Sequence, residues 1–214
     1  MSQTAGWRRL VLPRSPARNY GAGVELEPDQ VVEVLRGPLR TIAEAHRPPA
    51  NAGLPEKHGV YAWWMTPGAI SAVQGPSHPS EPYELLYVGI SPKRASSKAT
   101  VRSRIRGQHL GGNIGSSTFR QSLAALLFEQ EGWRTRWSGS RTQLVPEHNY
   151  ALSHWQREHL RVTWVERHQP PKVKGRVITL MQPPLNLAEN KSHPLYHRLK
   201  AQRRKLRDTA TNRP

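Results

Sequence analysis

Hydrophobic positions in the middle of the chain form two short runs, residues 59–64 and 84–91, that are rich in β-branched and aromatic residues. Such residues favour strands. A segment rich in Pro, Gly and Ser, residues 66–82, separates the two runs. We therefore predict a pair of strands joined by a hairpin loop that is longer than usual.

Apolar residues at helical spacing mark the segments on either side of this hairpin. Residues 25–45 predict two short helices, divided at Gly37-Pro38. Further helices are predicted at 119–130, with Ser117 or Thr118 as its cap, and at 147–159 and 173–181; further strands are predicted at 133–137 and 160–165.

These elements predict an α/β fold, in which a small, mostly antiparallel sheet is flanked by helices. We expect three parts: an N-terminal arm with short helices (residues 1–54), a central domain (55–196) and a basic C-terminal tail (197–214). Residues 1–24 have little to bury and are predicted to form a mobile arm. The tail is predicted to be a basic helix or a disordered arm.

Net charge changes this picture, because the 214 residues carry a formal charge of +17. Such an excess favours a polyanionic partner, with nucleic acid first; the alternative is that the charge serves only solubility. The chain has no cysteine, so thiolate zinc sites and disulfides are excluded and no zinc is expected. No apolar run is long enough to cross a membrane and no signal peptide is evident, so we expect a cytoplasmic protein without a membrane partner.

The positive charge is most concentrated just after the second predicted strand. From Leu85 through Phe128 the chain contains no carboxylate. The basic residues of this segment are Lys93, Arg94, Lys98, Arg102, Arg104, Arg106 and Arg120. A strand pair followed by an arginine-rich helix without counter-charges indicates a site for an anion.

The tripeptides Gly59-Val60-Tyr61 and Tyr87-Val88-Gly89 resemble the signature of the GIY-YIG nuclease superfamily. Further elements follow in the order of that family: Arg104-Ile105-Arg106 with His109, then Ser117-Thr118-Phe119-Arg120, then Gln182-Pro183-Pro184-Leu185-Asn186. The resemblance covers roughly residues 55 to 196.

The resemblance implies a role for five residues in phosphodiester hydrolysis. Tyr61 would relay a proton from the attacking water, Tyr87 would assist the nucleophile, and Arg104 would hold the phosphate. His109 would assist proton transfer, and Asn186 would order the site. The residues expected to bind nucleic acid around them are Lys98, Arg102, Arg106, Arg120, Lys174 and Arg176.

The spacing between Arg104 and His109 departs from the family pattern. The family pairs these positions four residues apart, whereas here they are five apart. In an α-helix the extra residue turns the second side chain about 100° further around the axis. We expect a local distortion at Gly107 to restore the contact.

The family also implies Mg²⁺ or Mn²⁺, held by a glutamate on the late helix. Counting back from Asn186 leads to Lys174, which cannot ligate a cation while charged. Glu166 and Glu189 are weak substitutes. The chain is therefore interpreted as a DNA endonuclease that uses a divalent metal, or alternatively as a catalytically inactive nucleic-acid-binding protein on the same scaffold. A basic RNA-associated protein is a third class, which fits the charge but not the motifs.

Overall fold

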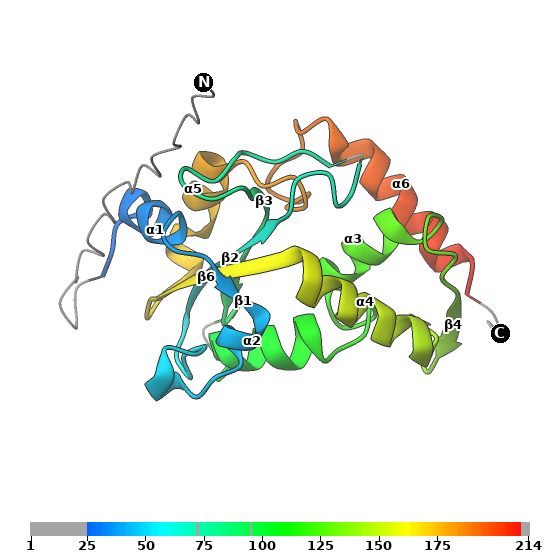
Figure 1. Ribbon diagram of the computed structural model, residues 1–214, viewed down its shortest axis with the longest axis horizontal. Coiled ribbons are helices and arrows are strands. Elements are labelled where there is room, and N and C mark those ends of the chain that lie inside the picture. Colours follow the sequence, from blue (N-terminus) through cyan, green and yellow to red (C-terminus); the bar gives the residue numbers. More distant parts are fainter. Residues whose placement is uncertain (1–24, 72, 95, 211–214) are drawn as a thin grey trace, which may run out of the picture.

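The computed structural model describes residues 25–71, 73–94 and 96–210, and its centre is a four-stranded antiparallel sheet (Figure 1). The strand order is β1 (Arg40–Thr41), β6 (Leu160–Glu166), β2 (Gly59–Met65) and β3 (Glu84–Ser91). β2 and β3 pair as predicted, and β6 adds to the other side of β2. The predicted arm at residues 1–24 lies outside the described residues.

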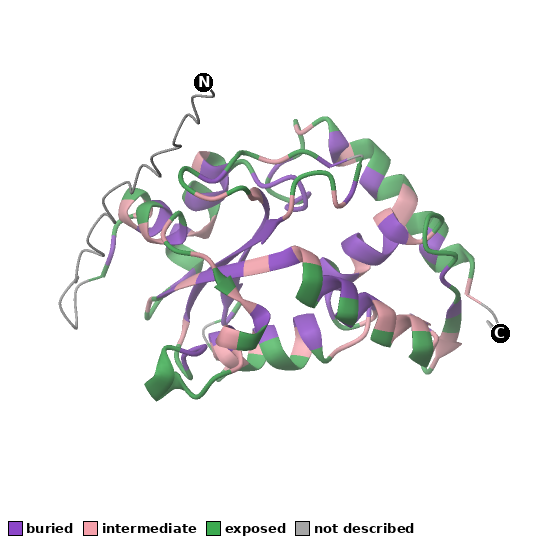
Figure 2. Ribbon diagram, in the orientation of Figure 1, coloured by how far each residue is buried: buried purple, intermediate pink, exposed green. Residues whose placement is uncertain are grey.

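Helices cover both faces of the sheet, which explains why every residue of β2 is buried (Figure 2). Alternation along the strand directs Val60, Ala62 and Trp64 to one face and Tyr61, Trp63 and Met65 to the other. The first face packs against α1 (Pro28–Leu35) and α5 (Pro171–Met181). The second packs against η2 (Ser103–Leu110), α3 (Thr118–Leu127), α4 (Pro146–His159) and α6 (Leu195–Asp208).

The remaining elements are short. β4 (Thr135–Ser138) and β5 (Arg141–Leu144) form a separate two-stranded hairpin, of which the sequence predicted only the first strand. The second of the two predicted N-terminal helices shrinks to α2 (Ile42–Ala45), because β1 takes the residues before it. A 3₁₀ turn, η1 (Pro49–Asn51), leads to β2. The α/β class and the antiparallel sheet flanked by helices are confirmed.

The basic C-terminal segment is a helix that packs on the domain. α6 buries Leu195, Leu199 and Leu206 in the core that also contains α3, and leaves its basic side chains outside or at the edge of that core. Spacing at i, i+4 and i+11 places these leucines on one side of the helix. No helix in the described residues is long and apolar enough to cross a bilayer.

Candidate active site

The site begins on β2 and β3, where Tyr61 lies directly opposite Gly89. Tyr61 is fully buried. A Cβ atom built on Gly89 would lie 2.3 Å from the hydroxyl and from Cζ of Tyr61. The glycine therefore provides the space that the phenol ring occupies. The two tripeptides of the sequence thus lie side by side on β2 and β3.

Tyr61 is the first member of a buried hydrogen-bonded chain. Its hydroxyl lies 2.7 Å from Nε2 of His109, and Nδ1 of His109 lies 2.8 Å from Oγ of Ser117. Ser117 is also the N-cap of α3, since its Oγ accepts a hydrogen bond from the Arg120 backbone N–H. A neutral imidazole donates through one ring nitrogen and accepts through the other, so His109 links the two hydroxyls in either tautomer.

Burial sets the protonation of this chain. The pKa of His109 is lowered well below 6.5 by burial first and then by the charge of Arg104, so the ring is neutral at pH 7. Burial raises the pKa of Tyr61, Tyr87 adds to this, and Arg104 opposes it. The neutral ring can therefore accept a hydrogen bond from the Tyr61 hydroxyl, which keeps its own proton at pH 7.

The five-residue spacing between Arg104 and His109 is accommodated because η2 is a π-helix. Its hydrogen bonds join residues five apart, as in the 2.8 Å bond from the Gly111 N–H to the Arg106 carbonyl. The wider turn brings Arg104 close enough to His109 and Tyr61 for its charge to affect the pKa of both. The predicted distortion extends over the whole segment 103–110 instead of Gly107 alone.

Arg104 and Tyr87 lie near the hydrogen-bonded chain of Tyr61, His109 and Ser117, which we call the relay. Nη1 of Arg104 donates to the Gln108 side chain, while its buried Nε has no hydrogen-bond partner within the described residues. Tyr87 packs on Phe119 with ring centroids 5.1 Å apart. Its pKa is raised by burial first, and the charges of Arg104 and Arg203 oppose that shift. The Nε of Arg104 is enclosed by protein, as are the Nε atoms of Arg120, Arg167 and Arg203, so it does not by itself mark a ligand site.

Asn186 acts on the strand and not on the relay. Its Oδ1 accepts from the Val88 N–H at 2.9 Å and its Nδ2 donates to the Val88 carbonyl at 2.8 Å. Because β3 is an edge strand, this amide takes the place of a neighbouring strand and fixes the backbone between Tyr87 and Gly89.

The expected metal position holds an ion pair. Lys174 on α5 is hydrogen-bonded to the Glu189 carboxylate, which lies in the loop after Pro184. The pKa of the neighbouring Lys93 is lowered by burial first and then by the charges of Arg104 and Lys174, and the charge of Glu189 opposes this shift. Glu166 is exposed and is paired with Lys57 at 2.8 Å.

These residues do not fit a Mg²⁺ or Mn²⁺ ion. An ammonium group cannot coordinate a cation and repels it, and here it also neutralises the nearest carboxylate. Within residues 25–71, 73–94 and 96–210, no three His, Asp or Glu side chains form a metal-binding group.

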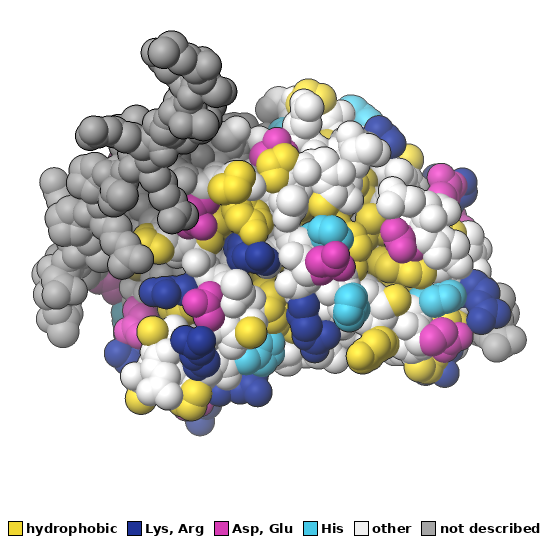
Figure 3. Space-filling model, in the orientation of Figure 1, with side chains coloured by type: hydrophobic (Ala, Val, Ile, Leu, Met, Phe, Trp, Pro, Cys, Tyr) yellow, Lys and Arg dark blue, Asp and Glu magenta, His cyan; other side chains and the backbone are white. Residues whose placement is uncertain are grey.

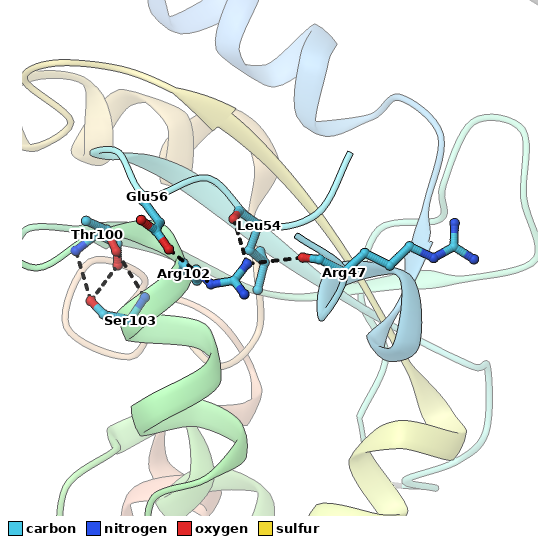
Figure 4. Close-up of polar contacts among 6 residues, drawn as sticks. All are labelled: Arg47, Leu54, Glu56, Thr100, Arg102 and Ser103. Carbon is cyan, nitrogen blue, oxygen red and sulfur yellow. Dashed lines mark hydrogen bonds and ion pairs between the residues drawn. The ribbon is translucent and has the colours of Figure 1, made fainter. Parts of the chain in front are cut away.

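Two arginines that the sequence assigned to nucleic-acid binding make bonds within the protein. Arg102 donates to the carbonyls of Arg47 (3.1 Å) and Leu54 (3.4 Å) and lies 3.5 Å from the Glu56 carboxylate (Figure 4). Arg120 is fully buried and its terminal nitrogens all bind protein oxygens. The fully buried Arg120 guanidinium does not face an external ligand, so we correct that assignment. The Arg102 side chain stays partly exposed, and its role in nucleic-acid binding remains a prediction. Lys98, Arg106 and Arg176 are exposed.

Sequence reasoning missed Ser117 as the partner of His109, although its capping role was predicted. It also missed Arg203, whose charge acts on the pKa of Tyr87, and Lys93, whose pKa responds to Arg104, Lys174 and Glu189. Both residues lie in segments rich in Lys and Arg, which indicated anion binding but did not distinguish them from their neighbours.

Comparison with protein families matches residues 59–206, well over half of the chain, to the GIY-YIG catalytic domain. Comparison with curated proteins and with solved structures gives no match. The matched range contains Tyr61, Gly89, Arg104 and His109, and it extends through most of α6. With the two tripeptides paired on adjacent strands, this chain belongs to the family of GIY-YIG catalytic domains.

Proposed function

We propose that the protein binds DNA through a basic cluster formed by Lys93, Arg104 and Lys174. We further propose that the Lys174–Glu189 ion pair prevents metal-dependent cleavage. The ion pair is the observation that carries this proposal. Mg²⁺ is usually held by one or two carboxylates besides water and substrate oxygens. A lysine at position 174 removes one carboxylate and neutralises the other.

Support for an anionic ligand comes from the charges at the site. Lys93 responds to the charges of Arg104, Lys174 and Glu189. Three cationic side chains therefore lie near one acidic side chain. Arg104 is only partly buried, and a guanidinium can bind phosphate with two parallel hydrogen bonds. On the face drawn in Figure 3, Lys and Arg side chains are mixed with acidic side chains and His, so this face shows no continuous basic surface. The local cluster is therefore the better indication of where an anion binds.

An active endonuclease is the second candidate, and the intact Tyr61–His109–Ser117 chain favours it. In that function Tyr61 would accept a proton from the attacking water as its own proton passes to Nε2 of His109. Arg104 would stabilise the charge on the phosphate oxygens. A carboxylate would have to come from a released Glu189 or from a partner.

The deciding experiment measures DNA binding and nicking of supercoiled plasmid in Mg²⁺, Mn²⁺ and EDTA. The variants are Lys174→Glu, Tyr61→Phe and the double variant, with Lys172→Glu as matched control because Lys172 is an exposed residue of the same helix. We expect the wild type to bind DNA equally in EDTA and to leave plasmid intact. Lys174→Glu should nick plasmid with metal, Tyr61→Phe should abolish that nicking, and Lys172→Glu should not nick.

Two results would overturn the proposal. If the wild type nicks plasmid with metal and Tyr61→Phe does not, the second function is correct. If structured RNA displaces DNA at lower concentration than unlabelled DNA does, the ligand is RNA. Salt-sensitive binding alone does not discriminate, because every basic nucleic-acid-binding protein shows it.

A further inference from the structure

Arg120 is a buried cation whose partners are all neutral. Its two terminal nitrogens make six hydrogen bonds of 2.6–3.1 Å. The acceptors are the carbonyls of His109, Leu110 and Asn149 and the side chains of Gln156, Asn149 and Ser153. Burial lowers the pKa of Arg120 to about 10, so the group stays charged at neutral pH. Nε of Arg120 is buried without a partner in the described part of the chain, so the bonds to neutral oxygens are made by the two terminal nitrogens alone. A buried charge is costly, so this concentration of bonds calls for a structural reason.

The bonds of Arg120 converge on the end of the π-helix. Nη1 donates to the carbonyls of His109 and Leu110, the last two residues of η2. Gln156 donates to the same His109 carbonyl at 3.1 Å, and Ser153 to the Leu110 carbonyl at 2.9 Å. The carbonyls at the end of a helix lack partners within it, and here α3 and α4 supply them.

We propose that Arg120 is a positioning residue, which keeps the segment 103–110 in its π-helical form and thereby holds His109 against Tyr61. Long π-helical segments are rare, so an external constraint is needed to maintain one. His109 is held at both ends: its carbonyl is bound by Arg120 and Gln156, and its ring by Tyr61 and Ser117. This role of Arg120 in positioning His109 does not depend on whether the protein cuts DNA.

The competing explanation is that Arg120 only stabilises the fold. Replacement of Arg120 by lysine distinguishes this from a role in positioning His109. Lysine keeps the charge but offers one nitrogen in place of the planar fork that spans both sets of acceptors. Arg120→Lys should therefore release part of the η2 carbonyl network without removing the charge near His109. The matched control is Arg167→Lys, since Arg167 is also a largely buried arginine but binds Glu25 and the Leu26 carbonyl beside α1.

The test compares these variants by NMR in the full-length protein. Hydrogen exchange of the Gly111 amide reports the π-helical bond to Arg106. The ring nitrogen signals of His109, identified by their loss in His109→Gln, report its bond to Tyr61. For Arg120→Lys we expect exchange at Gly111 to quicken by about tenfold or more and the His109 signals to shift toward those of a free imidazole. Arg167→Lys should leave both unchanged even where it lowers the melting temperature equally.

A milder variant keeps the test decisive if Arg120→Lys does not fold. Ser153→Ala removes one donor to the Leu110 carbonyl and one acceptor of Arg120, and it creates little space. It should change the same two signals in the same direction by a smaller amount. Normal Gly111 exchange and normal His109 signals in a folded Arg120→Lys or Ser153→Ala protein would show that Arg120 only stabilises the fold.

Discussion

The ring of Tyr61 occupies the space in which a side chain at Gly89 would lie. The two residues are direct partners across β2 and β3, and a Cβ on Gly89 would come within 2.4 Å of three atoms of the tyrosine. Separations below 3.0 Å between such atoms require something to move. Since Tyr61 is fully buried, its ring has no solvent to move into.

Gly89→Ala should therefore displace Tyr61 and weaken its hydrogen bond to His109. We expect the free energy of unfolding to fall by about 1–3 kcal/mol, as in other overpacked cores. Urea unfolding measures the loss, and the His109 ring signals report the hydrogen bond. In the control Gly175→Ala, the new methyl meets nothing within 4 Å on α5, and removal of a helical glycine should be neutral or stabilise by about 0.5–1 kcal/mol. Equal stability of the two variants would contradict the steric argument.

Local patterns explain why so much of the fold was predictable. The β-branched and aromatic residues of β2 and β3 mark strands, and the glycine of each tripeptide marks close packing. Helical periodicity located α3, α4 and α5 to within a few residues of their ends. Tyr61 and His109 could be proposed as site residues because each belongs to a recognisable motif, whereas Ser117 was proposed only as a helix cap.

What the sequence did not predict depends on contacts between distant segments of the chain. Charge and position made Arg120 look like a surface residue, but α4 supplies the neutral oxygens that bury it. Arg102 is likewise held by backbone carbonyls about fifty residues away in sequence. The Lys174–Glu189 pair forms because the loop after Pro184 folds back on α5. The sequence suggested Glu189 only as a weak substitute for the metal ligand and not as the partner of Lys174.

Arg102 and Arg106 lie one turn apart and should respond differently to replacement by alanine. Arg102 binds two backbone carbonyls, so Arg102→Ala should lower stability by about 1–3 kcal/mol with little effect on DNA affinity. Arg106 is exposed, so Arg106→Ala should retain stability but weaken DNA binding and reduce the slope of log K against log salt by about 0.9. Thermal unfolding and fluorescence anisotropy at several salt concentrations measure both. Weaker DNA binding by Arg102→Ala at unchanged melting temperature would show that Arg102 faces the nucleic acid after all.

The neutral His109 predicts how stability depends on pH. Its pKa in the folded protein lies well below 6.5, because burial and the nearby charges of Arg104, Lys93 and Arg120 disfavour the protonated ring. In the unfolded chain the ring titrates near its ordinary value of about 6.5. Below that pH the unfolded state binds a proton that the folded state does not. The free energy of unfolding should therefore fall as pH decreases through 6.5, by at most about 1.4 kcal/mol per pH unit from this one residue.

Urea unfolding of the wild type and His109→Gln between pH 7.5 and 5 checks this dependence. The variant should lose less stability over that interval than the wild type, because glutamine does not titrate. His193→Gln is the control, since the pKa of His193 is also lowered by burial but its ring lies outside the relay and is less enclosed. His193→Gln should lower the pH dependence by less than His109→Gln. If the wild type and His109→Gln lose stability in parallel, the ring of His109 is free to take up a proton in the folded protein, and its contact with Tyr61 is looser than the 2.7 Å separation implies.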